Sequence, residues 1–393
     1  MNDDAVLIDQ LSVRTLADGQ ELSARVDGER VWFRFPAHPP IAPRAEPFLA
    51  IGLQEAMVRG VPLRLASPHA VSARLLRGLE AMQRVFVAWN SDDFRLVPLE
   101  ISVQEETPAG GWVLSAYSGG IDSSYTYVQE REAITHLLLV QGFDGNFGDD
   151  IWHANVEARA QFAHREGKGL IPVANNVRTF IERRRLSWAA LHGSLLAALG
   201  VALGARQMFI PSTFTLNELF PWGSHPLLDP LWSSDATRII HHGLEATRTA
   251  KTVAVASHPA SLDHLQVCWR GVDKNCGHCP KCVRTSLALH LIGKASSRLP
   301  PFENRSQLRW LKPGNPASLA FTEDLIHFAL LHQRPDLAKP LKSYRRHYLV
   351  KHHASELIKV YGARWARALA RRFASKGWHG DRARMQAARS WLD

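Results

Sequence analysis

The sequence predicts an α/β protein whose central part, residues 112–300, is a parallel sheet with helices on both faces. From residue 112 onward, apolar runs of strand length alternate with longer segments whose apolar residues recur at helical spacing. This alternation is typical of parallel sheets, because each strand needs a crossover connection and the helices then cover both faces. The pattern differs on either side, which predicts an N-terminal α+β module over 1–105 and a helical region over 306–393.

The N-terminal module shows hairpin and helix patterns but no residues that indicate chemistry. Residues 21–36 alternate between apolar and polar side chains and turn at Asp27-Gly28, which predicts a β-hairpin. Helical patterns cover 47–59 and 70–87, a strand pattern covers 94–103, and 105–111 has a linker composition.

The elements of the central part follow in order along the chain. Strands are expected at 111–117, 135–143, 169–177 and 206–213, and helices from 123 onward and over 152–167 and 188–205. Parallel sheets bind ligands beyond the carboxyl ends of their strands, so a site is expected in the turns that follow them. The last helix carries no charged residue, and its Ala and Gly content favours a buried crossover helix over a membrane span.

Positive charge is concentrated in the C-terminal region. The chain has a net charge of +10, and residues 306–393 hold 17 Lys or Arg against 6 Asp or Glu. Arg364, Arg367 and Arg371 fall on one helical face, which is either a solvated face or an electrostatic site for nucleic acid or an acidic protein partner. The start of the chain lacks the pattern of a secretory signal, so a cytoplasmic location without membrane contact is expected.

The most specialised turn follows the first central strand and reads Ser118-Gly119-Gly120-Ile121-Asp122-Ser123-Ser124. Glycine permits positive φ and lets a bulky anion approach the backbone, serine hydroxyls add donors, and a helix N-terminus favours negative charge. The turn predicts a phosphate site, and an ordinary tight turn with a Ser or Asp cap is the alternative. It has no lysine after the glycines, so it is not the Walker pattern, and it does not match G-x-G-x-x-G.

All four cysteines lie in one short stretch, with the spacing C-x7-C-x2-C-x2-C: Cys268, Cys276, Cys279 and Cys282. Four thiolates surround a zinc ion tetrahedrally and leave no open position, so the spacing predicts a structural zinc site. His278 is a competing ligand, and an iron–sulfur cluster, which also takes four cysteines, is the alternative.

The turn resembles the S-G-G-x-D-S motif of the PP-loop, or N-type ATP pyrophosphatase, superfamily. The resemblance implies an adenine nucleotide alpha hydrolase-like fold and cleavage of ATP between its α and β phosphates, with AMP transferred to the substrate. It also implies Mg²⁺, with Asp122 organising either the loop or this ion. A lysine that begins a helix after a late strand is common in the superfamily, which makes Lys251 the second catalytic candidate; a surface lysine is the alternative. The implied ATP-binding residues are Ser118, Gly119, Gly120, Asp122, Ser123, Ser124 and Lys251.

The turn and the cysteines together resemble the 7-cyano-7-deazaguanine synthase (QueC) family over about residues 112–295. In that family a deazaguanine carboxylate is adenylated, ammonia gives an amide, a second round gives the nitrile, and the zinc is structural. The family stretches S-G-Y-P-D-C-R and P-G-R-N are not matched by the corresponding residues 217–232 and 187–194, although Gly223, Pro226 and Asp229 retain part of the pattern. The adenylation is therefore better indicated than the deazapurine substrate.

We expect an ATP-dependent, AMP-forming carbon–nitrogen ligase that uses ATP, Mg²⁺ and Zn²⁺ and acts on a small carboxylate such as 7-carboxy-7-deazaguanine. Because the cysteines are all in the metal site and residue 2 is Asn2, neither a persulfide carrier nor a glutaminase nucleophile is indicated, and ammonia or another amine is the expected acceptor. The alternatives are a QueC-like enzyme of a defence-type system that modifies a partner protein or nucleic acid, and a non-catalytic nucleotide-binding module. No general base is evident; the candidates are His192, His225 and Glu218, each of which is also explained as a loop or core residue.

Overall fold

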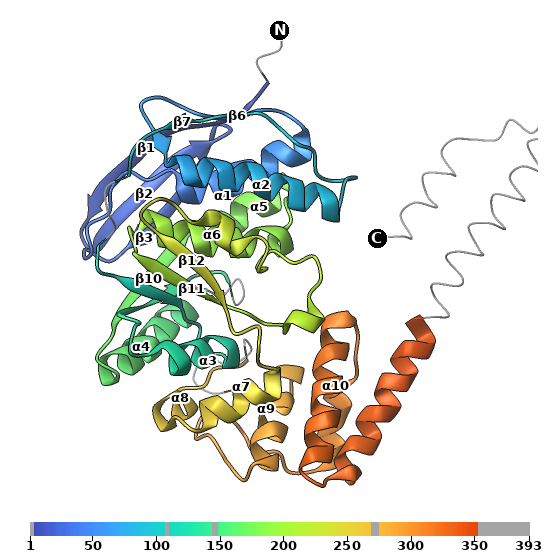
Figure 1. The fold of residues 1–393 in the computed structure, drawn as a ribbon. Helices are drawn as coiled ribbons and strands as arrows, with labels where there is room; N and C mark the ends of the chain where they lie inside the picture. Colours follow the sequence, from blue (N-terminus) through green and yellow to red (C-terminus); the bar gives the residue numbers. More distant parts are fainter. Residues whose placement is uncertain (1–3, 107–109, 144–147, 269–274, 353–393) are drawn as a thin grey trace, which may run out of the picture.

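The sheet is the organising element of the fold (Figure 1). The computed structural model describes residues 4–106, 110–143, 148–268 and 275–352. Among them, ten strands form one sheet in the order β12-β11-β8-β9-β10-β3-β2-β1-β4-β6. The first five strands of this order are parallel to one another, β10 and β3 are antiparallel, and the remainder are mixed. The predicted α/β class, a large and mostly parallel sheet covered by helices, is confirmed.

The parallel part contains the strands expected from the sequence and a fifth at its edge. The strands are β8 (Val113–Ala116), β9 (His136–Val140), β10 (Gly169–Asn175), β11 (Gln207–Pro211) and β12 (Arg238–His242). The chain moves outward from β8 to β9 and β10 and then returns to place β11 on the other side of β8. The strand order therefore reverses between β8 and β11, and such a switch point opens a crevice at the carboxyl ends of the two strands.

Helices cover both faces of the parallel strands. The helices are α3 (Ile121–Glu130), α4 (Asp149–Arg165), α5 (Val177–Arg184) and α6 (Trp188–Ala202). On β8, Leu114 packs in one core with Leu195 of α6, whereas the next-door Val113 packs in another core with Phe162 of α4. Figure 1 shows α3 and α4 on one face and α5 and α6 on the other. The predicted crossover helix is confirmed as a buried helix.

The N-terminal module extends the same sheet. Its elements are β1 (Val6–Leu16), β2 (Gly19–Val26), β3 (Glu29–Phe35), α1 (Glu46–Arg59), β4 (Leu63–Leu65), β5 (Ala70–Val71), α2 (Ala73–Trp89), β6 (Leu99–Glu100) and β7 (Ser102–Val103). The hairpin and both helices predicted from the sequence are confirmed. The strand expected over 94–103 is only two short pieces, and β1 was not expected. The core beneath α6 continues into this module and includes Phe33 and Phe48.

The remaining described elements follow β11 along the chain. They are η1 (Leu216–Glu218), η2 (Asp229–Trp232), α7 (Arg248–Ala256), α8 (Pro259–Asp263), α9 (Pro280–Leu291), η3 (Arg305–Leu311) and α10 (Pro316–Leu331). Among them, η2 packs against α2, α6 and β12. A further helical stretch covers 335–352, so the helical character expected after residue 306 is confirmed as far as the structure describes it. The arginine face at 364–371 lies outside the described residues. None of the described helices has both the length and the apolarity that crossing a membrane requires.

Candidate functional site

A cavity of about 550 Å³ opens at the carboxyl ends of the parallel strands. Its walls include Tyr117 and Ser118 after β8, Val140 at the end of β9, and Pro211 and Thr213 at and after the end of β11. The cavity therefore lies over the switch point between β8 and β11, where the strand order predicts a ligand crevice. Its dimensions fall in the range of small-molecule sites.

The glycine turn forms one wall of this cavity and is held by side chains from other elements. Gly119 has a φ of +79°, which requires glycine, and a Cβ there would lie 2.9 Å from the Arg159 guanidinium and would displace it. Arg159 donates to the carbonyl of Ser118, and the backbone N–H of Gln266 donates to the carbonyl of Gly119 at 2.8 Å. The carbonyl oxygens of Ser118 and Gly119 therefore accept hydrogen bonds from groups within the protein.

The N-terminus of α3 begins directly after this turn. Gly120 is its N-cap and has no side-chain cap, and the Ser124 N–H is bonded to the Gly120 carbonyl. The Ser123 hydroxyl donates to the same carbonyl at 3.1 Å. The first N–H groups of a helix have no partner within the helix and carry partial positive charge, so this wall is suited to an anion. Of the predicted loop residues, the cavity is lined by Ser118, Gly120, Asp122 and Ser123, while Gly119 and Ser124 lie behind it.

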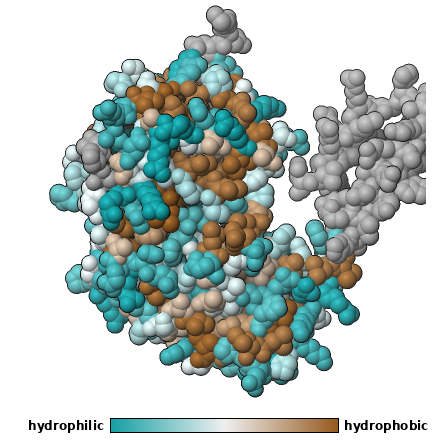
Figure 2. All heavy atoms as spheres, viewed as in Figure 1, coloured by the Kyte–Doolittle hydropathy of each residue, from teal (hydrophilic) through white to brown (hydrophobic). Residues whose placement is uncertain are grey.

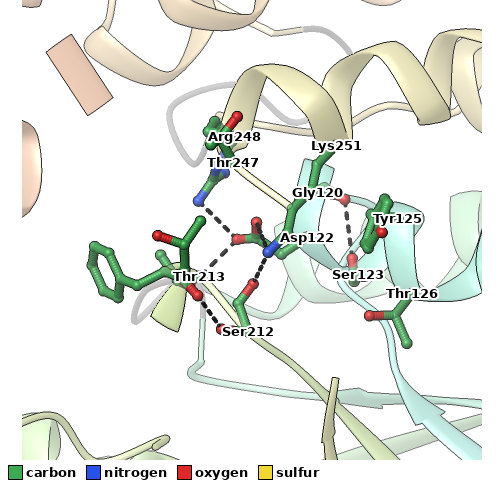
Figure 3. Close-up of polar contacts among 12 residues, drawn as sticks. Gly120, Asp122, Ser123, Tyr125, Thr126, Ser212, Thr213, Thr247, Arg248 and Lys251 are labelled. Atoms are coloured by element: carbon green, nitrogen blue, oxygen red, sulfur yellow. Dashed lines mark hydrogen bonds and ion pairs between the residues drawn. The ribbon is translucent and has the colours of Figure 1, made fainter. Parts of the chain in front are cut away.

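Asp122 stands in the first turn of α3 and is met by two cations from α7 (Figure 3). Its Oδ2 lies 2.8 Å from the Nη2 of Arg248, and its Oδ1 lies 3.8 Å from the Nζ of Lys251. The Thr213 hydroxyl donates to Oδ2 at 3.4 Å. Oδ1 is buried without a hydrogen-bond partner. Oδ2 is thus committed to Arg248 and Thr213, whereas Oδ1 faces the Lys251 ammonium without accepting a hydrogen bond.

Lys251 lies close to Asp122, the other predicted catalytic residue, but it is beneath the carboxylate and does not line the cavity. It is fully buried and donates from Nζ to the Ser212 carbonyl at 2.6 Å. Burial lowers the pKa of Lys251, and the nearby Asp122 partly opposes this shift. The cation that reaches the cavity from α7 is Arg248, one turn earlier in the sequence. The i, i+3 spacing of the two on one helix is the signal that sequence reasoning missed.

A second buried cation, Arg284 of α9, also lines the cavity and was not predicted. Only 9 % of it is exposed, and its Nε has no hydrogen-bond partner. Burial, with a further contribution from Arg248, lowers the pKa of Arg284 to about 9, so it is charged at neutral pH. Its guanidinium lies 4.0 Å from the ring centre of Phe321 in α10, and that of Arg248 lies 4.9 Å from the same ring.

Helix α10 is fixed to α7 by one carboxylate. Asp324 accepts hydrogen bonds from the backbone N–H of Thr249 at 2.8 Å and from its hydroxyl at 2.7 Å. Thr249 is the second residue of α7, so Asp324 satisfies one of the free N–H groups of that helix and places negative charge at its positive end. The C-terminal region therefore contributes directly to the position of Arg248 and Phe321.

The opposite end of the cavity is aromatic. Phe143 meets Trp188 edge-on with ring centres 4.7 Å apart, and His192 meets Trp222 at 5.2 Å. The guanidinium of Arg178 lies 3.7 Å from the ring centre of Trp188. All five side chains line the cavity. Such a wall is suited to a flat ring that stacks and carries polar edge groups.

Apolar side chains also reach the surface close to this end. The exposed ones between β11 and β12 are Leu216, Trp222 and Leu227. Figure 2 shows apolar patches (brown) over the middle of the face that it draws.

The structure places only one of the three candidate general bases at the cavity. His192 lines the cavity, and burial lowers its pKa, which keeps it neutral at pH 7. His225 is buried against Trp89 and does not line the cavity. Glu218 accepts from the backbone N–H and the hydroxyl of Thr215 in a capping box, which is a structural role.

Residues 217–232, which correspond to the substrate stretch of the family that the sequence resembles, are held to their surroundings by close packing and by hydrogen bonds. Gly223 packs so closely on α6 that a Cβ would lie 2.4 Å from the Ala189 carbonyl. Asp229 is completely buried and accepts from Ser224 and His241. Close packing therefore explains Gly223, and hydrogen bonding explains Asp229, without a role for either residue in substrate binding.

The four cysteines converge on one point at the start of α9. Their Sγ atoms all lie within 4.8 Å of one another, with Cys276 and Cys282 3.8 Å apart and Cys268 and Cys279 3.7 Å apart. Sulfurs at about 2.3 Å from a tetrahedral zinc ion are separated by about 3.8 Å, so the cluster could bind a metal such as zinc. The hydrogen bond between Cys282 and Cys279 lowers the pKa of Cys279 and raises that of Cys282. The cluster therefore favours the thiolate at Cys279, and a bound metal would replace the proton of Cys282.

No family model, no curated protein and no solved structure matches the chain in the three comparisons made with known proteins. The fold and the site define it as an α/β protein with a cationic and aromatic cavity over its strand switch point and a four-cysteine cluster beside that cavity.

Proposed function

We propose that the protein is an ATP-dependent, AMP-forming ligase that adenylates a carboxylate and passes the acyl group to ammonia or another amine. One observation carries the proposal. The glycine turn after β8 faces a cavity in which Asp122 meets Arg248, with Lys251 beneath the same carboxylate. A helix N-terminus, a carboxylate and fixed cations around one cavity are groups that bind a nucleoside triphosphate and its metal ion.

The chain supplies binding and orientation for the phosphates. The free N–H groups at the start of α3 bind phosphoryl oxygens, and the cations offset the charge that develops as pyrophosphate leaves. The carboxylate of Asp122 at the cavity wall is the group that would hold Mg²⁺, because this ion is usually held by one or two carboxylates together with substrate phosphates. When bound, Mg²⁺ neutralises the phosphates and aligns them for in-line attack.

The aromatic end of the cavity is the place for the carboxylate substrate. Trp188 with its stacked Arg178 provides a surface for a flat heterocycle and a positive charge for its carboxylate. These features make 7-carboxy-7-deazaguanine the first acid to test. Reduced thiols and a need for ATP both favour a cytoplasmic setting.

The test is pyrophosphate release from ATP and Mg²⁺ in the presence of ammonium, with and without 7-carboxy-7-deazaguanine, with products followed by mass spectrometry. Acid-dependent release of pyrophosphate and AMP, with an amide or nitrile product, is the expected result. ATP binding without turnover of this acid would retain the nucleotide site and exclude this substrate. A chain that binds neither ATP nor pyrophosphate would refute the proposal.

A further inference from the structure

Arg284 is a buried cation that forms no ion pair within the described part of the chain. It is 9 % exposed, its Nε donates to no acceptor, and its guanidinium packs on the ring of Phe321. The carboxylates of Asp122 and Asp324 act on its charge, but neither forms an ion pair with it in the described structure. Burying a charge without a compensating partner is costly. A guanidinium in this state inside a cavity is suited to an anionic ligand that completes its hydrogen bonds.

The neighbours of Arg284 narrow down where that anion lies. On α9, Lys281, Arg284 and Thr285 have the i, i+3, i+4 spacing of one helical face, and all three line the cavity. Arg248 of α7 shares the Phe321 ring with Arg284. The two guanidinium groups are therefore held on one aromatic side chain, both at the cavity wall.

This cationic wall is distinct from the aromatic end and adjoins the glycine turn. Gln266, which fixes the Gly119 carbonyl, lines the cavity together with Ser118 and the α9 residues. The aromatic end has its own cation in Arg178. A single carboxylate at that end leaves Arg284 without an ion pair and Arg248 with Asp122 alone in the described structure. A group with several charged oxygens can meet both guanidinium groups and the start of α3 together.

We propose that Arg284 and Arg248 form a clamp for the pyrophosphate part of ATP, opposite the N-terminus of α3. The inference rests on the proposed function and names the group that the cations bind. In the reaction, an oxygen of the substrate carboxylate forms a bond to the α phosphorus, and the bond from that phosphorus to the α–β bridging oxygen breaks. The electron pair stays on the pyrophosphate oxygen, and the clamp stabilises the negative charge that gathers there.

The experiment measures the binding of pyrophosphate with Mg²⁺, and separately of AMP, by titration calorimetry on the full chain. The variants are Arg284→Met, which removes the charge at similar size, and Arg284→Lys, which keeps the charge but loses the planar fork. Arg309→Met, at an exposed arginine of η3, is the control for net charge.

The clamp predicts that Arg284→Met raises the Kd for pyrophosphate by about tenfold to a hundredfold, the usual effect of losing charge-assisted hydrogen bonds. Arg284→Lys should fall between it and the wild type, and the control should match the wild type. AMP affinity should not change. Because the free protein buries this charge without an ion pair and with its Nε unbonded in the described structure, the melting temperature of Arg284→Met without ligand should equal or exceed that of the wild type.

Two results would overturn the clamp alone: unchanged pyrophosphate affinity in a folded Arg284→Met, or a lower melting temperature of that variant without ligand, which indicates a structural cation. If the wild-type chain binds ATP and Arg284→Met gives either of these results, the clamp is refuted and the proposed function is retained. A wild-type chain that binds neither ATP nor pyrophosphate refutes both.

Discussion

The Nη2 of Arg248 in α7 lies 2.8 Å from the Oδ2 of Asp122 in α3, at the wall of the cavity. The pair joins the helix that follows the glycine turn to the helix that carries Lys251. Both partners are largely buried, with 15 % and 19 % of their side chains exposed. An ion pair in such a setting is well oriented, so the carboxylate fixes a cation at the place where we propose that phosphates bind.

Replacing Asp122 by alanine should abolish activity without unfolding the protein. We expect pyrophosphate release to fall by about a hundredfold or more, the usual effect of removing a group that acts on charge in the transition state. Circular dichroism should be unchanged, because Asp122 stands at the edge of the cavity. Asp18→Ala, at an exposed turn between β1 and β2, is the matched control. Turnover equal to the wild type would refute the role of Asp122.

The glycine turn and the cysteine cluster could be found from the sequence because each is defined by a few residues that lie close together in the chain. Gly119 is required by its positive φ, and the cysteine spacing brings four sulfurs together locally. Arg284 could not be found in the same way. It stands in an apolar helical stretch, and its role depends on Phe321, which lies 37 residues further along the chain.

The pairing that joins the sheet of the N-terminal module to the parallel strands could not be predicted from local sequence patterns either. The link is the antiparallel pairing of Ala174 with Arg34 and of Asn175 with Phe33. Each strand reads as a strand by itself, but the choice of a neighbour at a sheet edge depends on packing between distant parts of the chain. The side chain of Asn176 reinforces this pairing by accepting from the Trp32 N–H at 2.9 Å, a contact between residues 144 positions apart that no sequence pattern indicates.

Cys279→Ser should remove the metal and lower the melting temperature. Cys279 supplies one sulfur of the cluster and also caps α9 by accepting from the Cys282 N–H. We expect the metal content of the purified protein, measured by plasma mass spectrometry, to fall from about one zinc per chain to near zero. His278→Ala, an exposed neighbour whose Nδ1 contacts the Cys276 carbonyl, should keep the metal. Equal metal content and melting in Cys279→Ser would exclude a structural metal centre.

Asp324→Ala should loosen α10 from α7. The carboxylate makes two hydrogen bonds to Thr249, at 2.8 and 2.7 Å, at the start of α7. Loss of such a helix cap costs about 1–2 kcal/mol of the free energy of unfolding, which urea denaturation can measure. The adjacent Glu323→Ala is the control, because Glu323 contacts only the exposed side chain of Arg345 in the described structure and surface pairs contribute little. Equal losses in the two variants would mean that Asp324 does not act as a cap.

Glu21→Gln should destabilise the protein at neutral pH and have little effect in acid. The Glu21 side chain is completely buried and is contacted by Arg14, Arg30 and Arg34. Burial raises the pKa of Glu21, but hydrogen bonds from Arg14 and Arg34 outweigh it, so the net pKa is below the ordinary value of 4.5. A carboxyl whose pKa is lower in the folded state stabilises the fold above its unfolded pKa and loses this contribution as pH falls through its folded pKa.

The measurement for Glu21→Gln is the free energy of unfolding in urea at pH 7, 5 and 3. We expect the variant to be less stable than the wild type by about 2 kcal/mol at pH 7, the usual size for hydrogen bonds to a buried charge. The difference should shrink toward pH 3 as the wild-type carboxylate is protonated. Glu100→Gln, which affects a surface pair with Arg64, should show little difference at any pH. A deficit that is constant from pH 7 to pH 3 would show that shape, and not charge, makes Glu21 necessary beneath the three arginines.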